Sequence, residues 1–170
     1  NSEDPATWGF TPEQRRVWAL AYHRARLYYS VGDRAEIWSI GIAEDGSFAG
    51  DARREFIVDS GENYPVSDIV FDGDGRLYLA QRGPIRNGYD YGQFALSGKA
   101  RILRYARENR DDLATEGMWV ETPDEYAVGF ADGYRQSAGG IDLQYGYDRN
   151  GDIELGLCSA TLASTGDRLR

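Results

Sequence analysis

Three kinds of side chain are almost missing from this chain of 170 residues, which has one cysteine, one histidine and a single lysine among its 19 basic residues. The lone Cys158 excludes an intrachain disulfide and a zinc site made of several thiolates, so we expect a small buried apolar residue. A Ser-His-Asp triad would have to use His23. This residue follows Tyr22 at the tip of the first predicted hairpin, where we expect an exposed turn.

Long apolar runs and common catalytic motifs are missing as well. No run approaches the roughly 20 residues of a membrane-spanning helix, and no targeting segment is visible. The chain contains no GxSxG, no HExxH and no phosphate-binding loop. Its net charge of −9 argues against nucleic acid as a partner, because phosphate binding needs a concentrated basic patch. We therefore expect neither membrane insertion nor nucleic-acid binding.

The chain is instead rich in glycine (21 residues) and tyrosine (12 residues), and it repeats itself. The segment "RLYYSV" at 26–31 recurs as "RLYLAQ" at 76–81. Just upstream of each copy, "VWALAY" at 17–22 aligns with "VSDIVF" at 66–71. Alternating strands that recur at such a spacing are typical of β-propellers, in which each repeat forms one four-stranded blade.

A third copy begins later, where "YDRNGDIELG" at 147–156 matches "FDGDGRLYLA" at 71–80. Both segments place an aromatic residue and an aspartate before an Asp-Gly or Asn-Gly pair, and an alternating strand follows. We expect the carboxylates of Asp72 and Asp148 to accept hydrogen bonds from backbone N–H groups of the turn. The glycine pairs supply the positive φ that a tight hairpin needs.

These repeats predict an all-β fold, a partial β-propeller of about two and a half four-stranded antiparallel blades at 16–59, 64–122 and 140–170. The predicted strands are 16–22, 25–31, 36–42 and 53–59, then 66–71, 76–82, 100–107 and 117–122, then 140–147, 152–157 and 160–165. The alternative architecture is a β-sandwich of about ten strands, which needs no internal repeat.

So few blades cannot close a ring, because propellers have four to eight blades around a central channel. A bare edge strand at each end would invite further pairing. We expect the chain to be a piece of a larger propeller, with further blades from the same parent chain. The alternatives are that identical copies assemble or that another polypeptide completes the propeller.

The segment "YPVSDIVFDGDGRLYLAQRG" at 64–83 resembles blades of the six-bladed NHL and SMP-30/gluconolactonase propellers. Lactonases of the SMP-30 type hold a divalent metal in the central channel with acidic and amide side chains. By this resemblance Asp68 and Asp142, early in two inner strands, are candidate ligands. The resemblance therefore implies a metal-dependent lactonase-like hydrolase as an alternative function.

Two long links rich in glycine and tyrosine, 83–99 and 124–140, are predicted to share the face of the propeller that carries function. The candidate ligand-binding residues on them and beside them are Arg82, Arg86, Tyr89, Asp90, Tyr91, Tyr126, Tyr134 and Arg135. Tyrosine and arginine are favoured at recognition surfaces, although these tyrosines would also serve to pack the links onto the blades.

The leading interpretation is a non-enzymatic recognition or scaffold module that binds a protein or a carbohydrate. From the habits of this fold class we expect it in an extracytoplasmic, secreted or cell-surface location. A purely structural piece of a larger propeller is a further alternative.

The turn "DRNGDIE" at 148–154 places oxygen ligands at alternate positions, Asp148, Asn150 and Asp152, as the start of a calcium loop does. Its glycine comes too early for such a loop, and its match to the hairpin at 72–76 favours a plain structural turn. We therefore expect no cofactor, with calcium at this turn as the alternative.

Overall fold

The computed structural model describes residues 4, 9, 12–32, 34–58, 64–83, 98–122, 125–144, 146, 149–150 and 161–166. Within these residues ten strands form three antiparallel sheets, of four, four and two strands. The prediction of an all-β fold is confirmed, and the strands do not divide into the two sheets of a sandwich. In this described part, no helix is long and apolar enough to cross a membrane.

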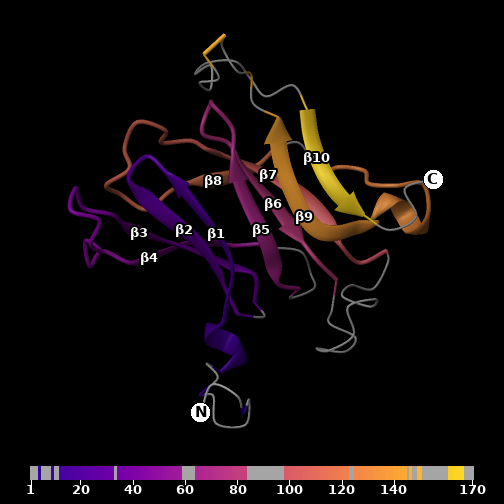
Figure 1. Cartoon of the computed structure of the whole chain (residues 1–170), viewed down its shortest axis with the longest axis horizontal. Coiled ribbons are helices and arrows are strands. Elements are labelled where there is room, and N and C mark those ends of the chain that lie inside the picture. The colour runs from indigo at the N-terminus through magenta and orange to yellow at the C-terminus, as the bar shows by residue number, and fades with distance from the viewer. Residues whose placement is uncertain are drawn as a thin grey trace.

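The first two sheets are meanders, in which strands that follow one another in the chain are neighbours in the sheet (Figure 1). The first sheet contains β1 (Val17–His23), β2 (Arg26–Val31), β3 (Glu36–Gly41) and β4 (Arg53–Ile57), and the second contains β5 (Val66–Phe71), β6 (Leu77–Gln81), β7 (Arg101–Arg107) and β8 (Trp119–Glu121). Two 3-10 turns, η2 (Glu13–Arg15) and η3 (Asp132–Tyr134), precede β1 and β9.

The turn between β5 and β6 explains why these two strands form where the sequence predicts them. One carboxylate oxygen of Asp72 accepts hydrogen bonds from the backbone N–H groups of Asp74 (3.0 Å) and Arg76 (2.8 Å). Gly75 has a φ of +77°, which a residue with a Cβ adopts only at a cost. The predicted Asp-Gly hairpin is thus present in the second sheet.

The third sheet differs from the prediction. It pairs β9 (Ser137–Gln144) directly with β10 (Thr161–Gly166), with Leu143 opposite Leu162. The sequence predicts 152–157 as the second strand of this unit and 160–165 as the third, but 161–166 lies beside β9. The segment 152–157 and most of the hairpin at 148–154 lie outside the described residues.

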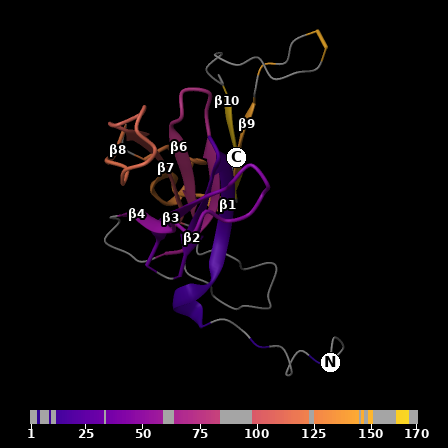
Figure 2. The same cartoon turned by 90° about the vertical axis from the view of Figure 1, so that its left-hand side faces the viewer.

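The three sheets stack with their first strands side by side, so that β5 contacts β1 on one side and β9 on the other (Figures 1 and 2). The core between the first and second sheets comprises Ala19, Tyr28, Ala35, Ile37, Val58, Val66, Ile69, Phe71, Leu77, Leu79, Leu103 and Tyr105. The core between the second and third comprises Tyr78, Ala80, Ile102, Val128, Ile141 and Leu143. All five residues of β6 are buried, because the second sheet is covered on both faces.

Aromatic rings fill much of the space between the first two sheets. The ring of Tyr28 lies 4.8 Å from that of Phe71, and the ring of Phe56 lies 4.6 Å from that of Tyr105. Trp119 of β8 joins both pairs, with ring centroids 6.2 Å from Tyr28 and 5.7 Å from Phe56. Tilted and edge-on pairs of this kind add to the free energy of burial, so this interface is a large part of the core.

A buried carboxylate adds directional hydrogen bonds between the first two sheets. Glu55 of β4 is 3% exposed. Its Oε1 accepts hydrogen bonds from Ser39 (2.5 Å) and Arg53 (3.0 Å) of its own sheet. Its Oε2 accepts from the backbone N–H of Gly117 and the indole N–H of Trp119, both at 3.0 Å, from the second sheet and the loop before it. Burial raises the pKa of Glu55, but the hydrogen bonds from Ser39, Trp119 and Arg53 outweigh it, and the net pKa is lowered.

Glu55→Ala should lower the free energy of unfolding by about 3–5 kcal/mol, because the buried partners of the carboxylate lose their acceptor. Glu55→Gln keeps the shape and one acceptor oxygen, so its loss should be smaller. Urea unfolding followed by tryptophan fluorescence measures both. The matched control is Glu44→Ala, at an exposed carboxylate between β3 and β4, which should change stability by less than about 0.5 kcal/mol. Equal losses at the two positions would contradict a structural role for Glu55.

Candidate functional site

Phe130 lies on the loop that leads into β9, and it is the most exposed of the large apolar side chains among the described residues. This loop, residues 126–136, is closed on itself by backbone hydrogen bonds. Val128 N–H donates to the carbonyl of Tyr134 (2.6 Å), and Gln136 N–H donates to that of Val128 (3.1 Å). The side chain of Gln136, 1% exposed, donates from Nε2 to the carbonyl of Ala131 (3.1 Å). The loop is therefore held from inside as well as at its base.

This loop presents two aromatic rings to solvent. Phe130 is 78% exposed and Tyr134 is 56% exposed. Tyr134 has a φ of +64°, in the left-handed region that bulky residues rarely adopt. Such a conformation costs free energy and persists only where the surroundings impose it, often at functional sites. Tyr134 is among the residues predicted from the sequence, but Phe130 is not, because a single aromatic residue in a glycine-rich loop has no periodicity to mark it.

Charged pairs fix the base of the loop to the second sheet. The guanidinium of Arg135 forms a two-pronged pair with Glu125, with N–O distances of 2.5 and 2.7 Å. Arg101 of β7 lies 4.0 Å from the same carboxylate and donates two hydrogen bonds to Gln81. The charge of Arg135 is therefore paired with Glu125, so this arginine has a structural role at the base of the loop.

The two links predicted to share a face meet at one described point. The backbone N–H of Gly98 donates to the carbonyl of Arg135 at 3.0 Å. Of the candidate residues on the first link, Arg86, Tyr89, Asp90 and Tyr91 lie outside the described residues, so their role stays a prediction.

Two other candidates pack against the sheets. Tyr126 is half-buried, with its ring 6.1 Å from that of Tyr78, which is the packing role that the sequence left open. The guanidinium of Arg82 lies over the ring of Trp18, 5.0 Å from its centroid. Burial lowers the pKa of Arg82. Among the described candidates, Tyr134 is thus the most accessible for recognition.

A groove of about 320 Å³ lies beside β9 and brings together Asp68 and Asp142, the two candidates of the lactonase alternative. Its lining is Asp68, Gly140, Ile141, Asp142, Ala163, Ser164 and Thr165. Asp68 already accepts a hydrogen bond from the backbone N–H of Ile141 (2.9 Å), and Asp142 accepts one from that of Leu143 (2.8 Å).

No group of three or more histidine, cysteine or acidic residues suited to a metal ion occurs in the part of the chain that the structure describes. Of the calcium candidates, Asp148 and Asp152 lie outside the described residues, and Asn150 is an exposed turn residue. The described residues thus offer two carboxylates, Asp68 and Asp142, in one groove.

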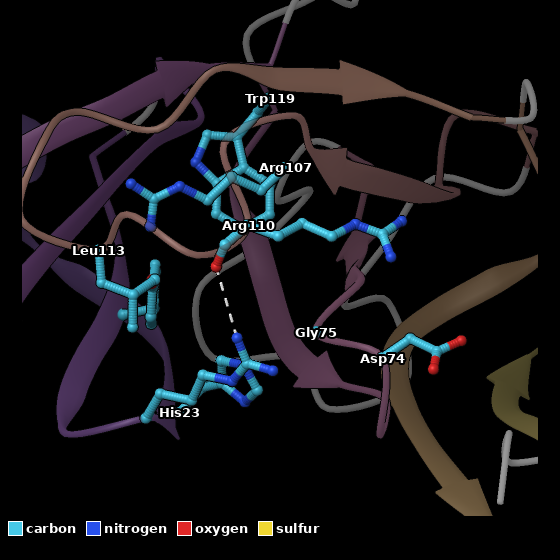
Figure 3. A pocket seen from close by; sticks show the side chains of 9 residues that line it. His23, Asp74, Gly75, Arg107, Arg110, Leu113 and Trp119 are labelled. Atoms are coloured by element: carbon cyan, nitrogen blue, oxygen red, sulfur yellow. Dashed lines mark hydrogen bonds between the residues drawn. The ribbon is translucent and has the colours of Figure 1, made fainter. Parts of the chain in front are cut away.

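A second, much smaller cavity lies where three turns meet, between β1 and β2, between β5 and β6, and after β7 (Figure 3). Its lining is His23, Arg24, Tyr28, Asp74, Gly75, Arg107, Arg110, Leu113 and Trp119. The Arg107 guanidinium is turned toward the loop after β7, where it donates to the carbonyls of Asp112 and Thr115. The cavity measures about 10 Å³, which holds about one water molecule, so it is too small for a substrate.

His23 is not the exposed turn residue that the sequence predicted. Its ring stacks on Phe71 with 4.3 Å between centroids and 5° between planes, so it belongs to the contact between the first two sheets. Burial and the neighbouring Arg24 lower the pKa of His23 below 6.5, and Asp72 opposes them in part. The end of a hairpin can therefore be buried by the turn of the next repeat, which local sequence does not reveal.

Comparison of the chain with protein-family models, with curated proteins and with solved structures gives no match.

His23 should make stability depend on pH. Because its folded pKa is lowered, the unfolded chain binds the proton more readily, and stability should fall as the pH drops through about 6.5 towards the folded pKa. The ring is the only imidazole, so its NMR signal reports this pKa directly. His23→Phe keeps the stack on Phe71 and should flatten the stability profile between about pH 7 and 5. A measured pKa above 6.5 would show that the ring is not held neutral.

Proposed function

We propose that this chain is a non-enzymatic recognition module of β-propeller architecture, whose loop at 126–136 binds a protein or a carbohydrate. The architecture is supported by two four-stranded meanders and a third sheet that stack face to face with their first strands adjacent. This arrangement is how propeller blades follow one another. It agrees with the resemblance of 64–83 to NHL and SMP-30 blades, which remains a proposal, as does an extracytoplasmic location.

The observation that carries the recognition role is the pair Phe130 and Tyr134, exposed on a loop that Gln136 and Arg135 hold in place. Exposed aromatic rings have little side-chain entropy to lose when a partner covers them. The hydrogen bonds inside the loop reduce the backbone ordering that binding would otherwise require. An exposed aromatic pair on a loop held in place, with Tyr134 in a strained left-handed conformation, therefore suits a binding surface better than it suits a solvated turn.

The chemistry of the loop limits the class of partner that it would bind. Phe130 offers an apolar ring, and Tyr134 offers a ring with a hydroxyl, which together fit the apolar face of a sugar or an aromatic or aliphatic side chain of a protein. The chain carries a net charge of −9, so a neutral or basic partner is favoured over an acidic one.

Alanine at either aromatic position should weaken partner binding at least about tenfold, which is about 1.4 kcal/mol and within the range of interface hot spots. The measurement uses a glycan array and a random-peptide display library to obtain a ligand, followed by titration calorimetry with Phe130→Ala and Tyr134→Ala.

The matched control for this prediction is Phe48→Ala, at an aromatic residue that is 65% exposed but lies between β3 and β4. It should bind as the unchanged chain does. Ligands that bind all the variants equally well would exclude the loop as the recognition site. A chain that selects no ligand in either screen would instead favour the purely structural alternative.

A metal-dependent lactonase-like hydrolase is the second candidate function. The observation that favours it is the groove beside β9, where carboxylates from two neighbouring first strands, Asp68 and Asp142, line one space of about 320 Å³. A divalent cation would need further oxygen ligands, since calcium takes six to eight.

If this second function is correct, titration calorimetry with Ca²⁺, Mn²⁺ and Zn²⁺ should show one bound cation per chain. Asp68→Asn and Asp142→Asn should each weaken that binding about tenfold or more, because an amide carries no charge, and lactone hydrolysis should fall with it. The control Asp45→Asn changes an exposed acid between β3 and β4. Metal binding that is unaffected by either groove variant would exclude this site.

A further inference from the structure

Arg107, the last residue of β7, is a buried cation whose hydrogen-bond acceptors are all uncharged groups. The residue is 4% exposed. Its Nε donates a hydrogen bond to Oδ1 of Asn109 (3.0 Å), and its Nη2 donates to the backbone carbonyls of Asp112 (2.8 Å) and Thr115 (2.6 Å). These contacts hold the loop after β7, but they bring no negative charge to the guanidinium.

The remaining nitrogen of this guanidinium, Nη1, is buried and has no hydrogen-bond partner among the described residues. An arginine side chain offers only donors and keeps its positive charge in proteins. A buried charge is costly unless hydrogen bonds and a counter-charge compensate it. The loop after β7 therefore satisfies only part of Arg107, and the side that carries Nη1 is suited to an acceptor with negative charge.

The acidic side chains around this arginine are held by other groups. Asp74 pairs with Arg76 at 2.8 Å, and Figure 3 shows its carboxylate directed away from the side on which His23 and Leu113 lie. The other two acids are equally engaged: Glu55 pairs with Arg53 (3.0 Å), and the carboxylate of Asp112 accepts from the hydroxyl of Thr115 (2.6 Å). Within the described part of the chain, Arg107 thus forms no ion pair with any of them.

The space beside Arg107 is the cavity of about 10 Å³ where three turns meet (Figure 3). Arg24 lines it from the turn between β1 and β2, and this residue is exposed, so the cavity lies within reach of solvent. Burial and the charge of Arg24 lower the pKa of His23, which lines the same cavity, against the opposing effect of Asp72. Arg24 and Arg107 therefore place positive charge around a space that takes about one water molecule.

We propose that this cavity is a binding site for one monatomic anion, chloride, which accepts hydrogen bonds from Nη1 of Arg107 and is attracted by the charge of Arg24. A chloride ion is only slightly larger than a water molecule, so it fits a space that is too small for sulfate, phosphate or an organic acid. A water molecule would satisfy the N–H groups, but it would leave the buried positive charge without a counter-charge.

The bound anion would connect the first two sheets. His23 and Arg24 reach the cavity from the first sheet, while Gly75 and Arg107 reach it from the second. An anion that binds the folded chain and not the unfolded chain raises the free energy of unfolding as its concentration rises. Chloride is thus a structural ligand of the contact between these sheets, separate from the recognition proposed for the loop at 126–136.

The first test is the melting temperature of the full chain at neutral pH, with sodium chloride replacing sodium gluconate at constant ionic strength. Constant ionic strength removes the general screening of a chain with a net charge of −9. Each tenfold rise in chloride above its dissociation constant should raise the melting temperature by about 3–5 °C. Bromide should act in the same way. A melting temperature that does not depend on which anion is present would overturn the proposal.

Two substitutions locate the effect. Arg107→Gln should abolish the chloride dependence, and circular dichroism checks that the variant folds, because Arg107 also holds the loop after β7. Arg24→Gln changes an exposed turn residue and should weaken the affinity for chloride at least about threefold. The matched control is Arg34→Gln, at an exposed arginine beyond the opposite end of β2, which should keep the affinity of the unchanged chain. Chloride dependence that survives at Arg24→Gln, or that Arg34→Gln removes equally, would place the anion elsewhere and overturn the site.

A direct test distinguishes the anion from a buried water molecule and does not depend on any variant. Crystals of the full chain grown in sodium bromide should show an anomalous scattering peak beside Nη1 of Arg107. An ordered water molecule at that place, without an anomalous signal, would show that the cavity holds water and would overturn the proposal.

Discussion

The structure depends on sheets that have two unlike faces. The face of the second sheet towards the first sheet carries large side chains such as Phe71, which pack against Tyr28 of the first sheet at the density of a protein interior. The opposite face packs against the third sheet. Because the second sheet is covered on both faces, β6 is buried throughout, while the first sheet keeps Tyr22 exposed.

Apolar packing alone does not fix how far one sheet slides along the next, because it has no direction. The carboxylate of Glu55 supplies that direction by accepting hydrogen bonds from its own sheet and from Trp119 of the next. Its burial would be costly without these donors. The stack of His23 on Phe71 adds a second contact between the same sheets, beside Trp119. Directional contacts thus set the position of one sheet on the next, while apolar packing supplies stability.

The sequence predicted the eight strands of the first two sheets closely, because period-two alternation and the turn at Asp72 are local signals. It misplaced the partner of β9, since pairing with 161–166 depends on contacts across a long segment. It also placed His23 in solvent, because the residue that buries it, Phe71, belongs to another repeat. Local sequence signals thus determine where the strands lie, while tertiary contacts determine how they pair and which of their ends are buried.

In the candidate site, too, tertiary contacts decide what the local sequence does not show. Tyr126 and Tyr134 look alike in the sequence, yet the backbone pairing of 126 with Ile102 sets Tyr126 against Tyr78, while the left-handed turn at Tyr134 directs its ring outward. The loop that carries Phe130 is anchored on the second sheet, through Glu125 near Arg101. A partner bound there would meet a support that is already packed on both faces.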